Sequence, residues 1–438
     1  MTSPRPAPAV PDRPPAVRPR RGLRRPGLRR ALQRLLRGPD GPAFDVAHLS
    51  SVHRWTDNRV HMREAATAAK HHRTLLVAVD SPTTVPETGV HVVLLPRRRR
   101  AARVVLSTSR AALLALRSGA GVVHLHDPEL LLVVPVLKLA GRRVVFDAHE
   151  VISEATADKD YVPEALRRPF VLLSRLLVWF AGRACDHVVV ATAITARDYP
   201  AHKTTVVHNF PRLRAEEEAL RPLADRAPRA AFIGVVSEAR GSRVMADAAT
   251  SPAFPAGWHL DVAGGPYPDD ALSVFDDAVA AGRATVHGLL SPEDARDLLL
   301  DARVGVVVLQ PGTAYEKVFS TKLFEYLAAG LPVVCSDFPV WREVVEPYGC
   351  VRFVDPTDPD AVARALAWYA EHPDELARQG AAARRAAVEV FDWAKEEPAL
   401  LGVWAALGAP DRAAAGEGPV APGSVRARPG ATSPGPAR

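Results

Sequence analysis

The sequence predicts an α/β protein built from two doubly wound domains. At 438 residues, the chain is longer than one ordinary hydrophobic core requires, which favours two domains of common size. Short runs of apolar, often β-branched residues alternate with longer helical patterns, which is typical of a parallel sheet covered on both faces. The alternation stops at residues 209–228, where prolines and charged residues gather, and then starts again.

Seven strands are expected before this break and six after it. The first set covers residues 43–49, 74–79, 90–95, 121–126, 143–147, 187–191 and 204–208, and the second covers 230–233, 258–263, 285–288, 304–309, 332–335 and 351–354. We therefore expect one Rossmann-like domain over residues 43–210, a linker over 211–228 and a second such domain over 229–390. Residues 391–408 are expected to form a helix that packs back on the first domain.

The positive charge of the chain lies at its two ends. Residues 1–42 hold eleven Arg against two Asp, so this basic, Pro-rich arm carries +9, more than the formal net charge of +7 of the whole chain. We expect the arm to be disordered, as is the tail over 409–438. The remaining residues are mildly acidic. No aromatic residue interrupts the arm, so we expect no nucleic-acid partner, while adhesion of the arm to an anionic membrane surface stays open.

The sequence predicts a cytoplasmic protein. Three cysteines occur without a C-x-x-C pair, and the N-terminus lacks the apolar stretch of a secretory signal. The longest apolar stretches, residues 130–140 and 170–181, contain Lys138 and Arg175 and are too short to span a bilayer. The second stretch, which includes Trp179, has two open interpretations: a helix on the inner face of a membrane, or an ordinary crossover helix buried against the first sheet.

Polar residues follow two strands of the first domain. The strand over 121–126 ends in His126 and Asp127, and the strand over 143–147 is followed by His149 and Glu150. Ligands of doubly wound sheets bind outside the carboxyl ends of the strands, so these side chains form one candidate cleft. The alternative is that Asp127 caps a helix and His126 is a hydrogen-bonded structural histidine.

In the second domain, Gly234 follows the first strand and Arg240 stands close to the next helix. The spacing is not G-x-G-x-x-G, so no dinucleotide fingerprint is present. Backbone donors, a helix dipole and a guanidinium nevertheless suit a diphosphate at this point. The alternative is a surface Arg at the start of an amphipathic helix.

The most informative segment is residues 318–334. Ser320 or Thr321 can cap a helix whose first turn carries Lys322, and helical spacing places Glu325 on the same face. A cation and free amides at a helix start suit a phosphate, and a carboxylate one turn further suits sugar hydroxyls. A plain i,i+3 ion pair between Lys322 and Glu325 is the alternative.

This segment resembles the donor-site signature of family 4 glycosyltransferases, which are retaining enzymes. Five other motifs agree with it in order and type over about residues 44–408: Asp57-Asn58-Arg59-Val60 with Arg63-Glu64-Ala65, His124-Leu125-His126-Asp127-Pro128-Glu129-Leu130, Asp147-Ala148-His149-Glu150, Val207-His208-Asn209 and His287-Gly288-Leu289-Leu290. The resemblance implies the GT-B fold, in which two Rossmann-like doubly wound domains face each other across a cleft. It also implies a nucleotide diphosphate sugar as co-substrate, with no cofactor and no metal.

The resemblance assigns roles to single residues. His126, Arg240 and Lys322 would be catalytic; Gly234, Arg240, Phe319, Ser320, Thr321, Lys322 and Glu325 would bind the donor; Asp57, Arg59, Asp127, His149 and Glu150 would lie on the acceptor side or in the cleft. Two positions depart from the family pattern. Lys317 stands where the first Glu of a common Glu-x7-Glu pair is expected, with Glu316 beside it, and Val235 replaces a common phosphate-binding Arg.

The expected activity is sugar transfer from a nucleotide diphosphate sugar to a hydroxyl acceptor, in the biosynthesis of a cell-envelope polysaccharide or glycolipid. Two alternatives remain open from the sequence. One is a GT-B-fold sugar-nucleotide epimerase, and the other is a non-catalytic scaffold at a membrane surface. The residues do not identify the donor sugar or the acceptor.

Overall fold

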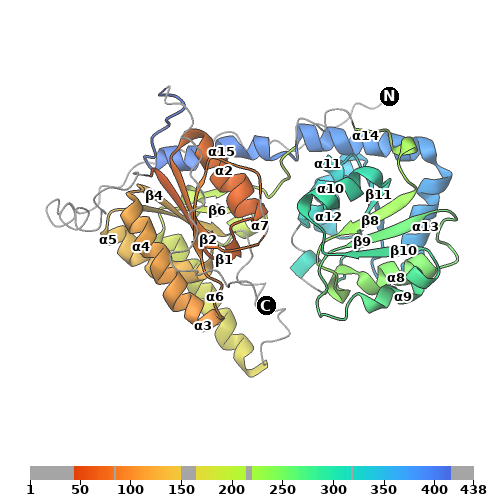
Figure 1. Cartoon of the computed structure of the whole chain (residues 1–438), viewed down its shortest axis with the longest axis horizontal. Helices are drawn as coiled ribbons and strands as arrows, with labels where there is room; N and C mark the ends of the chain where they lie inside the picture. Colours follow the sequence, from red (N-terminus) through yellow and green to blue (C-terminus); the bar gives the residue numbers. More distant parts are fainter. Residues whose placement is uncertain are drawn as a thin grey trace, which may run out of the picture. The chain divides into compact units, whose positions relative to one another are not determined.

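The computed structural model describes residues 44–82, 85–148, 164–213, 220–312, 314–316 and 319–415. The chain divides into two compact units: unit 1 comprises the residues up to His208 and those from Glu396, and unit 2 comprises Asn209–Lys395. The expected basic arm over 1–42 and most of the expected tail lie outside the described residues. Each unit has its own sheet (Figure 1).

Unit 1 contains a seven-stranded, all-parallel sheet in the order β3-β2-β1-β4-β5-β6-β7. Its strands are apolar and mostly buried because helices cover both faces. The strands are β1 (Val46–Arg54), β2 (Thr74–Val79), β3 (His91–Leu95), β4 (Val122–Leu125), β5 (Arg143–Ala148), β6 (His187–Val190) and β7 (Thr204–Val206).

The helices of unit 1 lie on both sides of this sheet. In Figure 1, α4, α5 and α6 lie on one side, and α2 and α15 lie on the other. The helical segments are η1 (Asn58–Ala65), α2 (Ala66–His71), α3 (Arg100–Ala102), η2 (Arg103–Ser107), α4 (Thr108–Ser118), η3 (Pro128–Val133), α5 (Val134–Leu139), α6 (Glu164–Ala184), α7 (Ala193–Ala196), η4 (Ala201–Lys203) and α15 (Trp393–Ala406).

Helix α15 returns to unit 1 after the chain has completed unit 2. The indole of Trp404 is fully buried and packs edge-on against two imidazoles. Its ring centroid lies 5.5 Å from that of His48 and 6.0 Å from that of His124. Lys70 of α2 donates to Glu397 at 2.8 Å. This segment therefore contributes to the core of unit 1 beneath β1 and β4.

Unit 2 contains a six-stranded parallel sheet in the order β10-β9-β8-β11-β12-β13. Its strands are β8 (Arg229–Ile233), β9 (His259–Ala263), β10 (Ala284–Gly288), β11 (Val304–Val307), β12 (Val333–Ser336) and β13 (Val351–Val354). Its helical segments are η6 (Leu223–Asp225), η7 (Glu238–Arg240), α8 (Ser242–Thr250), η8 (Ser273–Phe275), α9 (Asp276–Ala280), α10 (Pro292–Asp301), η9 (Ala314–Glu316), α11 (Thr321–Ala328), α12 (Pro339–Val345), η10 (Glu346–Tyr348), α13 (Pro359–Glu371) and α14 (Pro373–Glu389).

The two strand orders confirm the doubly wound prediction. Both sheets run outward in one direction over their first three strands and then cross back, so each reverses its order once. Such a switch point, at the carboxyl ends of the two strands that flank it, is where ligands bind in this kind of sheet. The switch point lies between β1 and β4 in unit 1, and between β8 and β11 in unit 2.

Candidate functional site

The switch point of unit 2 is shaped by Gly234, which directly follows β8. Gly234 has φ of 141°, and a Cβ atom at this position would lie 1.9 Å from Cε of Lys322. Gly264, at the equivalent place after β9, has φ of 146°, and its Cβ would lie 1.7 Å from the carbonyl oxygen of Gly234. Only glycine fits here, because any side chain would displace Lys322 from the end of β8.

Arg240 and Lys322 bring two positive charges to this point. Nε of Arg240, the last residue of η7, donates to the hydroxyl of Tyr315 at 3.1 Å. Burial is the main cause that lowers the pKa of Lys322 to about 8, and the charge of Arg240 is the second cause. A cation that is destabilised by burial and by a neighbouring cation is relieved by an anion, so this part of unit 2 is suited to bind a phosphate group.

The start of α11 lies next to this pair. Ser320 holds the N-cap position, as expected, but among the described residues its side chain makes no capping hydrogen bond, and Thr321 is the first helical residue. The Phe319 ring packs edge-on against Phe324 at a centroid distance of 6.2 Å. Glu325 follows Lys322 by one turn and is half-buried. The structure thus brings the predicted donor-site residues of unit 2 together around the beginning of α11.

Of the two residues at the departure from the Glu-x7-Glu pattern, the structure describes only Glu316. Glu316 accepts a hydrogen bond from the backbone N–H of Gly312, so its carboxylate closes the turn before η9. Lys317 lies outside the described residues.

In unit 1, Asp57 and Arg59 anchor the segment that follows β1. The Asp57 carboxylate caps η1 by accepting from the backbone N–H groups of Arg59 and Val60, both at 2.8 Å. The Arg59 guanidinium, 4% exposed, forms a two-point pair with Asp147, at 3.1 Å from Nε and 2.8 Å from the terminal nitrogen. It also donates to the carbonyl of Val207 at 3.2 Å. Arg59 therefore ties β5 and β7 to η1 at the carboxyl edge of the sheet.

His126 lies at the centre of this network and is only 1% exposed. Its Nδ1 is 3.2 Å from the Asp147 carboxylate, and its Nε2 is 2.9 Å from Nδ1 of His48. Nε of Arg59 lies 3.0 Å from Glu64. Burial is the main cause that holds the pKa of Glu64 well above its usual range, and the charge of Asp147 is the second cause. Arg59 thus pairs with two carboxyl groups, those of Asp147 and Glu64, next to His126.

Four buried residues of this network are of metal-ligating types. His48, Glu64, His124 and His126 offer ligand atoms that lie within 4.8 Å of one another. The imidazoles of His124 and His126 stack with centroids 4.7 Å apart and an angle of 28°, which directs ring faces rather than nitrogen lone pairs toward each other. His48 and His126 already share a hydrogen bond, and Glu64 is paired with Arg59. These contacts occupy His48, His126 and Glu64 in part, whereas both ring nitrogens of His124 have no hydrogen-bond partner in the part of the chain that the structure describes.

Asp127 has a different role from helix capping. Among the described residues its side chain makes no capping bond to η3; instead it accepts from the backbone N–H of Ser51 at 2.6 Å and from the hydroxyl of Ser50 at 2.9 Å, and it pairs with Nδ1 of His53 at 2.9 Å. Burial alone would lower the pKa of His53, but the Asp127 carboxylate outweighs it and raises this pKa to about 9. For Asp127, burial opposes the shift, and His53 and the serine donors bring its pKa to about 2.

Sequence reasoning missed His53 and its serine neighbours. His53 is charged at neutral pH, its side chain is 22% exposed, and it stands at the unit 1 switch point. The signal in the sequence was the run of polar residues after the expected first strand. In the structure these residues belong to β1, which brings them to the sheet edge beside β4. His149 and Glu150, the two other predicted cleft residues, lie outside the described residues.

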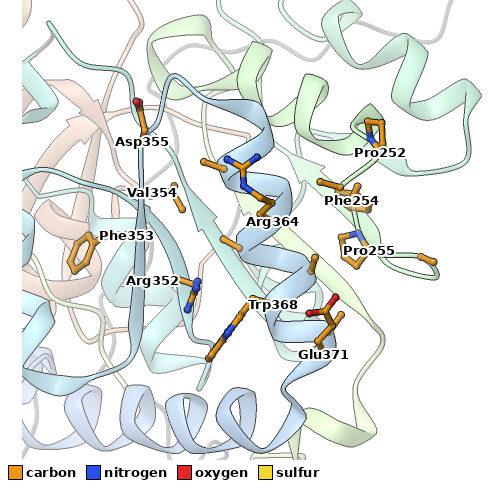
Figure 2. Close-up of a pocket in the computed structure, with 16 residues that line it drawn as sticks. Pro252, Phe254, Pro255, Arg352, Phe353, Val354, Asp355, Arg364, Trp368 and Glu371 are labelled. Carbon is orange, nitrogen blue, oxygen red and sulfur yellow. The ribbon is translucent and has the colours of Figure 1, made fainter.

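A separate pocket lies in unit 2, between β13, α13 and residues 252–256 (Figure 2). The Arg352 guanidinium lies 4.1 Å from the centre of the Trp368 ring on its wall. Asp355, at its rim, accepts from the hydroxyl and backbone N–H of Thr357, as a turn residue does. The described residues that were predicted to bind the donor do not line this pocket.

Part of the chain is similar to known glycosyltransferases. The family model for group 1 glycosyl transferases matches residues 227–372, which contain the Gly234, Arg240 and Lys322 group. The MMP α-(1→4)-mannosyltransferase of Mycolicibacterium hassiacum is 40% identical over 105 residues, which are 24% of this chain and 24% of that protein. The D-rhamnosyltransferase WbpZ of Pseudomonas aeruginosa is 24% identical over 150 residues, 34% of this chain and 38% of that protein. The chain thus matches well under half the length of either relative.

Solved structures resemble the chain over most of its length. Sucrose-phosphate synthase from Thermosynechococcus elongatus superposes with a TM-score of 0.63 at 16% identity, covering 84% of this chain and 99% of that one. HepE from Anabaena, in complex with UDP-glucose, gives 0.61 at 14% identity, covering 83% and 99%. WaaG, a glycosyltransferase involved in lipopolysaccharide biosynthesis, gives 0.60 at 13% identity, covering 82% and 99%. Together with the two switch-point sheets, these likenesses show the GT-B fold.

Proposed function

We propose that the protein is a retaining glycosyltransferase that moves a sugar from a nucleotide diphosphate sugar to a hydroxyl acceptor. The observation that carries this proposal is the position of Lys322 against Gly234, with Arg240 close by, at the switch point of unit 2. This group lies within the residues that match the group 1 glycosyl transferase model. The similar fold of HepE, which binds UDP-glucose, supports a nucleotide sugar as the donor.

The proposed donor site works mainly by electrostatics. Arg240, Lys322 and the amides around Phe319–Thr321 hold the diphosphate and stabilise the charge that develops on it as the glycosidic bond to the sugar breaks. Glu325 accepts hydrogen bonds from sugar hydroxyls of the nucleotide, for which its half-buried position at the second turn of α11 is suitable.

The proposed reaction retains the configuration at the anomeric carbon. The acceptor oxygen attacks from the face that the phosphate leaves; the carbon–oxygen bond to the diphosphate breaks, and the acceptor proton passes to a phosphate oxygen. In unit 1, Asp147 and His48 fix the ring of His126, while the more accessible His53 presents a positive charge at the same edge. We assign Asp57, Arg59 and Asp127 to holding this edge, together with His126, whose fully buried ring fits the alternative of a hydrogen-bonded structural histidine.

The proposed biological setting is based on the names of similar proteins. WaaG takes part in lipopolysaccharide biosynthesis, and the two matching curated proteins transfer mannose and rhamnose, so we propose a role in cell-envelope polysaccharide or glycolipid biosynthesis. We place the protein in the cytoplasm, where the basic arm over 1–42 attracts it to anionic lipid. No described helix is long and apolar enough to cross a membrane.

The test is transfer with the purified full chain and a panel of nucleotide diphosphate sugars. We expect release of the nucleoside diphosphate with one of them, and NMR of the product should show the anomeric configuration of the donor. Lys322→Ala should slow turnover by on the order of a hundredfold. Lys395→Ala, which removes an exposed lysine elsewhere in unit 2, is the matched control and should leave the rate unchanged. Equal rates for both variants would remove Lys322 from the site.

A further inference from the structure

One face of unit 1 exposes an unusual amount of apolar surface. Of the sixteen large apolar side chains that the described residues expose, ten lie on η2, α4, η3, α5 and α6. These ten residues, which we call the apolar face, are Val105, Leu106, Leu113, Leu132, Val136, Leu139, Leu172, Leu173, Leu176 and Trp179. Contiguous exposed apolar patches mark sites of interaction with another protein or a membrane.

The helices that carry the apolar face lie on the same side of the sheet. In Figure 1, α4, α5 and α6 cover one side of the unit 1 sheet, opposite α2 and α15. Both α4 and α6 pack against η3, so the three helical stretches are adjacent.

Helix α6 is apolar on two sides. Leu177, Val178 and Phe180 pack against the core, as the crossover interpretation of this helix expects. Leu172, Leu176 and Trp179, spaced by four and three residues, are 70%, 55% and 63% exposed. A crossover helix needs apolar residues only on the face that packs against the sheet, so the fold does not explain the apolar stripe on the outer face.

The charge of this face restricts what can cover it. Residues 97–118 contain seven Arg and no acidic residue. Exposed arginines lie on α4 and α6, at the start of α3 and directly before it, at positions 97–100, 110, 117, 168, 175 and 183. The body of the chain outside its two ends is mildly acidic, so this excess of arginine is not a general property of the sequence.

We infer that the apolar face is a docking surface for an anionic lipid bilayer. Leucines and a tryptophan that enter the interface, with arginines that contact lipid phosphates, match the chemistry of interfacial helices. A second copy of the chain fits poorly, because a symmetric contact would bring the two sets of arginines together. The basic ends of this chain are repelled by the same charges. The inference does not depend on the transferase reaction.

The experiment uses the full chain and vesicles of phosphatidylcholine with and without phosphatidylglycerol, the lipid carrying brominated acyl chains. We expect binding to the anionic vesicles and quenching of tryptophan fluorescence, and this quenching should largely disappear in Trp179→Phe. The variant Leu172→Ser/Leu176→Ser should reduce the partition coefficient at least tenfold. Leu289→Ser, at an exposed leucine of unit 2, is the control and should bind as the wild type does.

Three results would overturn the inference. The first is equal quenching of the wild type and Trp179→Phe, and the second is unchanged binding of the double leucine variant, which would leave the arm as the only contact. The third is a wild-type chain that sediments as a dimer without lipid while the double leucine variant is a monomer, which would make the apolar face an interface between two copies.

Discussion

Replacement of Arg59 by Met should destabilise unit 1 by about 3–5 kcal/mol, because it removes one partner of a buried ion pair. The guanidinium makes a two-point pair with Asp147, a further hydrogen bond to Val207 and a close contact with Glu64, and it is almost fully buried. Without it, the Asp147 carboxylate stays buried without its main counter-charge. For a unit of this size the loss corresponds to a fall in the melting temperature on the order of 10 °C.

Arg342→Met is the matched control for this prediction. Arg342 also forms a two-point pair, with Asp337, but both partners are exposed to solvent. Exposed pairs of this kind contribute about 0–1 kcal/mol. The same change of residue type thus separates the effect of burial from the loss of a positive charge.

The assay is calorimetry, with hydrogen exchange followed by mass spectrometry to locate the change. Arg59→Met should lower the unit 1 transition and increase exchange in β5 and η1, and Asp147→Asn added to it should recover part of the loss. If Arg59→Met and Arg342→Met have the same melting temperature, the buried pair does not hold this edge of the sheet.

Three further predictions concern titration and glycine. NMR should find the pKa of His53 near 9, and Asp127→Asn should return it toward 6.5. The pair stabilises the fold fully between about pH 4 and 6.5; the contribution is lost as the pH rises through 9, where His53 loses its proton, and as it falls toward 2, where Asp127 gains one. Affinity for a nucleoside diphosphate should fall as the pH rises through about 8, because Lys322 then loses its proton, and an unchanged affinity at pH 9 would speak against its role. Gly234→Ala should weaken that affinity at least tenfold, whereas Gly257→Ala, also at positive φ but with open space around it, should not.

The fold could be predicted from the sequence because each strand carries its own local signal. The run Thr74–Val79 is apolar at nearly every position, as a strand covered on both faces must be, and the structure buries all of it. The expected strands are present in both units, in the doubly wound orders. The exposed side of α6 could not be predicted, because a run of apolar residues does not reveal which of them the sheet covers.

The candidate site could be predicted only where the chemistry is local. Lys322 and Glu325 share one helix, so their spacing places them together. The partners of Asp127 could not be predicted, because they lie more than seventy residues earlier on β1 and meet it only through the pairing of β1 with β4. The approach of Lys322 to Gly234 likewise depends on the packing of α11 against the end of β8.

We propose that Arg240 and Lys322 hold a diphosphate at the switch point of unit 2. Calorimetric titration of the full chain with UDP and GDP, each compared with its monophosphate, tests it most directly. We predict that at least one diphosphate binds at least tenfold more tightly than its monophosphate, and that this preference disappears in Lys322→Ala but persists in Lys395→Ala. Equal affinity for the diphosphate and the monophosphate, or a preference that survives in Lys322→Ala, would show that Lys322 does not hold the diphosphate.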